Sequence, residues 1–314
     1  MQLQTKIPLE PKSENQIDYN SNVLLFGSCF SENIGEKLNY FQIKNTQNPL
    51  GILFHPKAIE TLILKSLTDF VYSQDDVFFH NEQWHCFDAH SKLSQSSKGS
   101  LIHHLNSQIA VTASNLKKAS HVVITLGTAW VYTSVETDKI VANCHKVPQK
   151  LFKKELLSVE EIIASLKRIL SSIKRVNPYV SVIFTVSPVR HIKDGFVENT
   201  QSKAHLITAI HQVLGNQSFY FPSFEIMMDE LRDYRFYKAD MIHPSPIAVN
   251  YIWEKFKEVW VSEASFKTME AVNVIQKGLQ HKPFNEKSEA HQKFLQNLNT
   301  KINALKALYP QMQF

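Results

Sequence analysis

The sequence has few cysteines, and they stand far apart. Its 314 residues include only Cys29, Cys86 and Cys144, and none of them belongs to a Cys-x-x-Cys pair. An odd number of separated cysteines does not suit a disulfide framework, and it lacks the ligand spacing of a structural zinc site. We therefore expect no disulfide framework, no metal site and no cofactor.

Long apolar runs are also missing. Nowhere does the chain approach the roughly 18 consecutive apolar residues that a transmembrane helix requires. The segment 1–16 is polar, contains two prolines and has no apolar core of a signal peptide. We expect a protein of the cytoplasm with no membrane partner.

Charge of one sign is never concentrated in a block. The net charge is +5, and the lysines are scattered among acidic residues. This distribution gives little support to a nucleic-acid partner. Hydrophobic residues make up 43% of the chain and charged residues 20%, which is typical of a globular protein with ample core.

What the chain does contain is an alternation of buried strands and amphipathic helices. Strands are predicted at 23–26, 41–44, 121–128, 180–186 and 219–222, with helices between them and a hairpin at 77–88. The run at 121–128 is rich in β-branched residues and should be a central strand. Strand and helix at this spacing predict an α/β fold, a three-layer doubly wound parallel sheet whose ligand loops lie at one end of the strands.

The chain divides into three predicted parts. Residues 1–21 read as an irregular lead-in, 22–261 as the α/β domain, and 262–314 as a C-terminal extension of two or three amphipathic helices joined near residues 282–284. The extension suits either of two roles, a cap on the α/β body or a contact with a second subunit, so an oligomer through these helices stays open.

The stretch around Ser28 reads as a strand that turns sharply into a helix. The apolar run at 23–26 suits a strand buried on both faces, and polar residues then surround Ile34 and Leu38 at a helical period. Gly27 lets the backbone turn, which leaves the hydroxyl of Ser28 at the tip. At such a place a nucleophile can attack and an oxyanion can be held, although a simple turn with a helix cap gives the same pattern.

A polar loop at 234–245 supplies the residues that favour catalysis. Asp240 and His243 are three positions apart, and in a tight turn this spacing lets the carboxylate reach the Nδ1–H of the imidazole. That contact fixes the tautomer and leaves Nε2 free to take a proton from a serine. Because this loop follows the last strand, it is expected at the same edge of the sheet as Ser28.

Four stretches together resemble a known family. Residues 26–30, 125–130, 187–191 and 234–245 are similar to the GSCFA family, which resembles the wider SGNH (GDSL-like) hydrolases. The resemblance spans about residues 22–260 in the same order. It implies a flavodoxin-like SGNH hydrolase fold and a serine esterase that acts on a small ester, such as an acylated carbohydrate.

The resemblance also implies roles for single residues. Ser28 would be the nucleophile, His243 the general base and Asp240 its orienting partner. The N–H groups of Ser28 and Gly51 would form the oxyanion hole. SGNH enzymes usually have a third-block asparagine two residues after a glycine. Here Thr128, Ala129 and Trp130 follow Gly127, so either Thr128 or Asn143 would supply the missing donor.

Four further side chains are expected to bind substrate in the cleft. They are Trp130, Lys146, Arg190 and His191. Three of the four are basic residue types, which hints at an anionic substrate. For each of them, a surface position or a hydrogen bond that holds a loop is an equally suitable interpretation.

Three other interpretations of the same residues remain open. An incomplete oxyanion hole is compatible with a catalytically weak or inactive binding or scaffolding protein. Cys29 is a second candidate nucleophile, although adjacent side chains at a sharp turn point in different directions. Asp240 and His243 as metal ligands are a weaker hypothesis, since no third and fourth ligand stand at a useful spacing.

Overall fold

The computed structural model describes residues 5–314, so residues 1–4 of the predicted lead-in lie outside the described part. Its centre is a five-stranded parallel sheet in the order β10-β9-β5-β1-β2. The strands are β1 (Val23–Gly27), β2 (Asn45–Gln47), β5 (His121–Leu126), β9 (Ser181–Val186) and β10 (Ser218–Tyr220). If the five strands of this sheet are numbered 1 to 5 in chain order and the sheet is read from the β2 edge, the strand order is 2-1-3-4-5. This is the order of flavodoxin-like doubly wound folds. The predicted fold class and the central position of β5 are confirmed.

The strands form where the sequence is continuously apolar. Every residue of β1, β5 and β9 is buried, as expected for a parallel sheet covered on both faces. The register pairs Phe26 with Ile124, and Ile124 with Phe184. The carboxyl ends of these three strands therefore meet at one edge of the sheet, where their exit residues come together.

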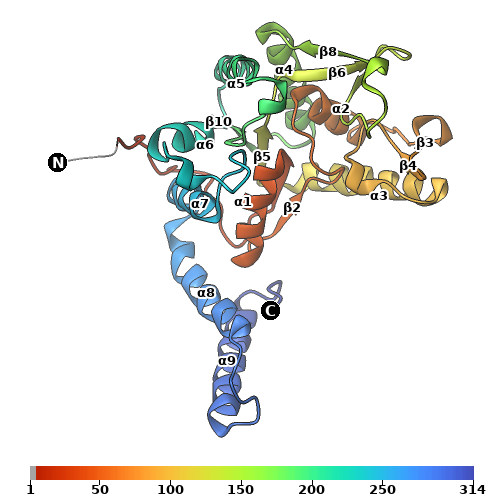
Figure 1. Cartoon of the computed structure of the whole chain (residues 1–314). Helices are drawn as coiled ribbons and strands as arrows, with labels where there is room; N and C mark the ends of the chain where they lie inside the picture. Colours follow the sequence, from red (N-terminus) through yellow and green to blue (C-terminus); the bar gives the residue numbers. More distant parts are fainter. Residues whose placement is uncertain (1–4) are drawn as a thin grey trace.

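Helices cover both faces of the sheet (Figure 1). One face packs against α2 (Pro56–Ser66), α3 (Lys98–Lys118), α4 (Val159–Val176) and α5 (Phe196–His211), and the other against α1 (Cys29–Tyr40) and α7 (Pro246–Trp260). Alternate side chains of β1 divide between the two layers of core, since Leu24 contributes to the first and Leu25 to the second. This gives the predicted three layers.

Two small antiparallel sheets extend the body. The predicted hairpin is confirmed as β3 (Phe78–His80) and β4 (Gln83–His85), whose turn residues Asn81 and Glu82 have φ of 45° and 62°. The other sheet has the order β7-β6-β8 and consists of β6 (Trp130–Ser134), β7 (Ile140–Val141) and β8 (Phe152–Leu156).

The second strand was predicted at 41–44, which is wrong by a few residues. Phe41 ends α1, and Gln42 has a φ of 60°, so the chain turns there and pairs with β1 only at 45–47.

The remaining short elements are α6 (Ser223–Glu225), a π-helical turn at Ile226–Glu230, and 3₁₀ turns at Gln74–Asp76, Ser91–Leu93, Gln149–Leu151, Ile192–Asp194, Tyr234–Phe236 and Glu263–Ser265.

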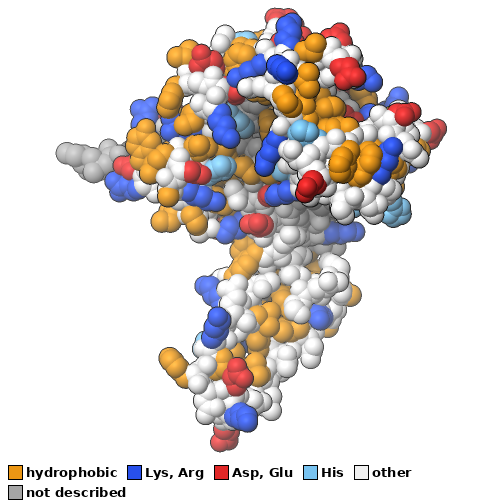
Figure 2. Space-filling model, turned by 45° about the vertical axis from the view of Figure 1, so that its right-hand side comes forward, with side chains coloured by type: hydrophobic (Ala, Val, Ile, Leu, Met, Phe, Trp, Pro, Cys, Tyr) orange, Lys and Arg blue, Asp and Glu red, His pale blue; other side chains and the backbone are white. Residues whose placement is uncertain are grey.

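The C-terminal helices α8 (Phe266–Gln280) and α9 (Glu289–Leu308) project from the body as a hairpin-like arm (Figure 1). Tyr40 of α1 holds the base of the arm through a 2.8 Å hydrogen bond to Asn273 Oδ1. Beyond α9 the chain returns to the body, where the rings of Tyr309 and Tyr19 lie 4.9 Å apart. Apolar side chains are visible along the arm in Figure 2. In α9, Leu295 is 37% exposed.

None of the helices within residues 5–314 combines the length and the apolar character that a membrane-spanning segment requires.

Candidate active site

The turn after β1 is shaped by Gly27. Its φ is +133°, and a Cβ built on it would lie 2.1 Å from the carbonyl oxygen of Thr125. Its N–H donates to Asn48 Oδ1 at 2.9 Å, which holds the neighbouring loop against the strand. A side chain at this position would therefore be both strained and crowded. The turn places Ser28 at the N-cap of α1, where Oγ accepts the N–H of Phe30 at 3.2 Å.

The hydroxyl of Ser28 is buried and already hydrogen-bonded. Its side chain is 2% exposed, and Oγ donates to Oγ of Ser187 at 2.9 Å. Ser187 directly follows β9, so the bond joins the exits of two strands. The N–H of Ser28 donates to the carbonyl of Thr125 at 3.1 Å. Among residues 5–314, no hydrogen bond links Ser28 to His243.

Asp240 and His243 form the pair that their spacing suggests. The carboxylate oxygen Oδ1 accepts the backbone N–H groups of Ile242 and His243 at 2.9 and 3.0 Å. Oδ2 lies 2.7 Å from Nδ1 of His243. The backbone N–H groups, followed by the imidazole contact, lower the pKa of Asp240 to about 2, so the carboxylate is ionised at neutral pH. It accepts the proton of Nδ1, and Nε2 is left as the basic nitrogen.

Arg190 holds this loop against the exit of β9. Its N–H donates to the carbonyl of Ile242 at 3.2 Å, and its Nη1 donates to the carbonyl of Met241 at 3.1 Å. Inside the loop, the N–H of Lys238 donates to the carbonyl of His243 at 2.7 Å. The position of the imidazole is therefore fixed from both ends of the turn.

Ser28 and His243 line the same cavity, which has a volume of about 530 Å³. A volume of this size suits a small-molecule ligand. Of the other residues singled out in the sequence, Cys29, Thr128, Trp130, Arg190 and His191 also line it. The two distant stretches of the chain thus meet at one hollow at the carboxyl edge of the sheet.

Comparison with known proteins agrees with the motifs of the sequence. The model of the GSCFA family matches residues 22–256, and that of the GSCFA domain protein C-terminal domain matches residues 272–314. The chain belongs to the GSCFA family. No curated protein matches it significantly.

Three solved structures are similar to this GSCFA chain in outline. A carbohydrate esterase family 3 protein from Talaromyces cellulolyticus is 9% identical, with a TM-score of 0.36 over 81% of this chain and 99% of its own. An acetyl esterase variant with an acetate ion is 10% identical, with a TM-score of 0.37 over 81% and 99%. An acetyl xylan esterase from the rumen bacterium Butyrivibrio proteoclasticus is 8% identical, with a TM-score of 0.33 over 83% and 64%.

The backbone donors expected for the oxyanion hole of this GSCFA protein are engaged elsewhere. Gly51 has a φ of +76°, and its N–H donates to the carbonyl of Asn48 at 2.7 Å within a turn. The N–H of Ser28 donates to Thr125, as described above. Neither N–H points freely into the cavity while these bonds are intact.

The two side chains expected to replace the third-block asparagine are engaged as well. Oγ1 of Thr128 accepts the N–H of Trp130 at 3.1 Å and lies 2.9 Å from Oγ of Ser202. Asn143 is not brought to the cavity of Ser28. It lines a separate hollow of about 280 Å³, and its Oδ1 accepts the N–H of His145 at 2.8 Å.

The residues expected to bind substrate fall into two groups. Trp130, Arg190 and His191 line the cavity, and Nε1 of Trp130 donates to the carbonyl of Glu198 at 3.2 Å. Lys146 sits in a turn with a φ of 60°, is exposed and does not line the cavity.

Cys29 is a free thiol that also lines the cavity. Burial, followed by the nearby Glu32 carboxylate, raises its pKa, so the thiol form prevails at neutral pH. This weakens Cys29 as a nucleophile, because the thiolate is the reactive form.

Within residues 5–314, no three His, Cys, Asp or Glu side chains come together in a group that could hold a metal ion.

Lys203 is the main residue of the site that sequence reasoning missed. Its side chain is 1% exposed, and Nζ donates to the carbonyls of Gly127 and Ser187 at 2.7 and 2.8 Å. Burial lowers its pKa to about 7. The spacing of Lys203 with Leu206 and Ile210 places it on the apolar face of α5. This spacing is the sequence pattern from which the burial of Lys203 could have been predicted.

His90 and Ser187 were missed too. His90 lines the cavity, although no motif in the sequence singles it out. Ser187 was noted only as part of a motif at the exit of β9. Its contact with Ser28 joins residues 159 positions apart, a relationship that no local pattern contains.

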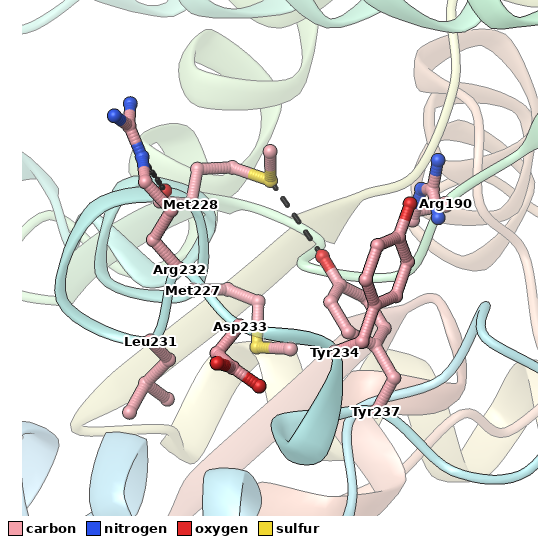
Figure 3. A pocket seen from close by; sticks show the side chains of 8 residues that line it. All are labelled: Arg190, Met227, Met228, Leu231, Arg232, Asp233, Tyr234 and Tyr237. Carbon is pink, nitrogen blue, oxygen red and sulfur yellow. Dashed lines mark hydrogen bonds between the residues drawn. The ribbon is translucent and has the colours of Figure 1, made fainter.

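A second cavity, of about 250 Å³, adjoins the first and is shown in Figure 3. The hydroxyl of Tyr237 donates to Sδ of Met228 at 3.8 Å across it, and the guanidinium of Arg190 lies 5.7 Å from the centre of the Tyr237 ring. Arg190 lines both cavities and so forms part of the wall between them.

Proposed function

We propose that this GSCFA protein is a cytoplasmic serine esterase that cleaves a small ester through an acyl-enzyme on Ser28. The observation that carries the proposal is that Ser28 and His243 line one cavity while the Asp240 carboxylate lies 2.7 Å from Nδ1 of His243. An imidazole with one nitrogen held by a carboxylate, facing the same hollow as a serine at a strand exit, has the parts of a serine hydrolase site.

In the first half of the reaction, Oγ of Ser28 attacks the ester carbonyl carbon. Its proton passes to Nε2 of His243 while the carbonyl π electrons move onto oxygen. The tetrahedral intermediate then collapses, the ester C–O bond breaks, and the imidazolium gives its proton to the departing alkoxide. The product is an alcohol and an acyl group bound to Ser28.

In the second half, a water molecule attacks the acyl carbon. His243 accepts a proton from the water and returns it to Oγ of Ser28 as the carboxylic acid leaves. Asp240 keeps Nδ1 protonated throughout and stabilises the imidazolium in both halves. Its own proton affinity is too low for it to take part in the transfer at neutral pH.

The bond between Ser28 and Ser187 describes the resting state in this proposal. Catalysis requires the hydroxyl of Ser28 to turn from Oγ of Ser187 towards Nε2 of His243. In this proposal a change of serine rotamer makes the contact, since catalytic hydrogen bonds are often loose before substrate binds. The substrate would be an acylated carbohydrate or another small ester, matched to a cavity of about 530 Å³.

Labelling with a fluorophosphonate tests the proposal, because this reagent reacts with an activated serine. We expect covalent labelling of the full-length protein that Ser28→Ala abolishes and that Cys29→Ser retains. Asp229→Asn is a control for the effect of a substitution at the surface, because Asp229 is exposed and pairs with Arg232. Absence of labelling in the wild type contradicts the proposal. Labelling that Cys29→Ser alone removes would make Cys29 the nucleophile.

A second candidate function is favoured by one observation. The N–H groups of Ser28 and Gly51 both donate to backbone carbonyls, which leaves the expected oxyanion hole without these two donors. A protein of this kind could bind an ester or a related ligand without cleaving it. If Ser28 is not labelled by the fluorophosphonate but the protein binds a small ester saturably, the binding protein would be supported over the enzyme.

A further inference from the structure

The proposed esterase needs a donor to the oxyanion, and the expected donors are either engaged or lie elsewhere. Oγ1 of Thr128 lies 2.9 Å from Oγ of Ser202, Asn143 lines a different hollow, and the N–H groups of Ser28 and Gly51 donate to backbone carbonyls. Loss of one oxyanion donor costs about 10² to 10³ in kcat in a serine hydrolase. The cavity should therefore contain a polar hydrogen that is not yet paired.

His191 carries a candidate for this group. Its Nε2 atom is buried and has no hydrogen-bond partner within residues 5–314. His191 also lines the cavity that Ser28 and His243 share. Buried polar groups are nearly always paired, so an orphaned ring nitrogen beside a candidate nucleophile calls for a ligand.

The ring of His191 is fixed in place. Its backbone N–H donates to Oδ1 of Asn199 at 2.8 Å, and its ring centre lies 5.6 Å from that of Phe54. Nε2 lies 2.9 Å from the point that a Cβ on Gly127 would occupy. The imidazole thus packs directly over Gly127, the glycine of the third block, and its Nε2 faces that glycine.

The protonation state suits a hydrogen-bond donor. Burial, followed by the positive charge of Lys203 and the nearby His243, lowers the pKa of His191 to about 3. The ring is therefore neutral at any pH at which the enzyme would work. A neutral imidazole with its proton on Nε2 donates one hydrogen bond and does not compete with His243 as a base.

We propose that Nε2–H of His191 is the oxyanion donor that replaces the third-block asparagine, an assignment that rests on the proposed esterase function. The nitrogen is unpaired in the resting protein and gains its partner when the carbonyl oxygen becomes negative. An interaction made mainly in the transition state raises kcat with little effect on KM. The assignment makes His191 a catalytic residue, beyond the substrate-binding role expected from the sequence.

Two substitutions at His191 test the assignment with p-nitrophenyl acetate as substrate. His191→Phe keeps a flat ring without a donor, and His191→Gln keeps an N–H at a similar distance from the backbone. We expect the phenylalanine variant to lose about 10²-fold or more in kcat with KM nearly unchanged. The glutamine variant should recover at least about tenfold of that loss, a rescue that a merely structural role would not produce.

Gly127→Ala provides a second variant in case the substitutions at His191 impair folding. The added methyl group meets Nε2 of His191 and Cβ of Phe54, both at 2.9 Å, so it should displace the imidazole and lower kcat in the same direction. Thermal unfolding of each variant checks that the fold is retained.

The outcomes separate this assignment from the proposed function. If His191→Phe retains the wild-type kcat while Ser28→Ala is inactive, the assignment is overturned and the esterase stands. An equal loss of kcat/KM in the phenylalanine and glutamine variants that comes from a higher KM also overturns the assignment, because His191 would then act in substrate binding. A wild-type protein without turnover dependent on Ser28 overturns both.

Discussion

Ser28 donates its hydroxyl proton to Oγ of Ser187 across 2.9 Å, which joins the exits of β1 and β9. Ser187 Oγ in turn accepts the N–H of Val189 at 3.3 Å. In the proposed mechanism, this bond is a competitor of His243 for the same proton. The balance between the two acceptors decides how reactive the serine is.

Ser187→Ala should leave Ser28 at least as reactive as in the wild type. The substitution removes the competing acceptor, so labelling by a fluorophosphonate should keep its rate or rise by roughly two- to tenfold, at a cost of about 1 kcal/mol in the free energy of unfolding. Ser181→Ala is a matched control, because Ser181 is a buried serine at the opposite end of β9. Loss of labelling in Ser187→Ala would mean that Ser187 is required for the chemistry itself.

Asp240→Asn should preserve the turn and impair catalysis. The asparagine keeps an Oδ1 that accepts the N–H groups of Ile242 and His243, but it no longer offers a carboxylate to Nδ1. We expect kcat to fall by about 10²- to 10⁴-fold with an unchanged melting temperature, since the imidazole loses its orienting partner. Steady-state kinetics beside Asp229→Asn measure the effect. A kcat within a few-fold of the wild type would remove Asp240 from the mechanism.

Gly27→Ala should unfold or strongly destabilise the protein. The φ of +133° is unfavourable for a side chain, and the new Cβ would lie 2.1 Å from the carbonyl oxygen of Thr125. We expect a loss of about 2 kcal/mol or more in the free energy of unfolding. Gly99→Ala is the matched control, because Gly99 lies in α3 with nothing near its Cβ position, and alanine there should stabilise by up to about 1 kcal/mol. Similar denaturation midpoints for both variants would contradict this account of the turn.

His55 should make the protein sensitive to mild acid. Its Nδ1 accepts the N–H of Ala58 at 3.1 Å as the N-cap of α2, and its Nε2 lies 3.1 Å from the carbonyl of Val141. Only the neutral ring satisfies both contacts, and burial lowers its pKa to about 4.

The sign of this effect follows from the proton balance. Between the ordinary pKa of histidine and about pH 4, the unfolded chain binds a proton at His55 that the folded chain does not. The free energy of unfolding should therefore fall with falling pH by up to about 1.4 kcal/mol per pH unit from this residue. Denaturant unfolding from pH 7 to 4 measures the slope, and His55→Asn, which retains a capping oxygen, should reduce it. An unchanged slope in His55→Asn would exclude His55 as its source.

The sequence predicted the fold well where one local pattern determines the structure. β5 and β9 are continuous apolar runs, and α4 has a strong helical period with Ser158 as its cap. β8 escaped prediction, because the consecutive charged residues Lys153, Lys154 and Glu155 leave it without an apolar run or an alternating pattern, and its pairing partner β6 belongs to a separate stretch of the sequence.

In the candidate site, too, local contacts could be predicted from the sequence, whereas contacts between distant segments could not. The contact between Asp240 and His243 is local, so their spacing was enough to anticipate it. The buried bonds of Lys203 to the ends of β5 and β9 depend on the packing of α5 against the sheet. The hydrogen bond of Ser28 likewise depends on the order of the strands, which no single stretch of sequence contains.

The most direct test of the central claim is mass spectrometry of the protein quenched during turnover of p-nitrophenyl acetate. The proposed mechanism predicts an acyl group on the peptide that contains Ser28, located on the serine by fragmentation. This group should be absent in Ser28→Ala and strongly diminished in His243→Ala. Acylation of Cys29, or turnover without any covalent intermediate, would contradict the claim that Ser28 and His243 act as nucleophile and base.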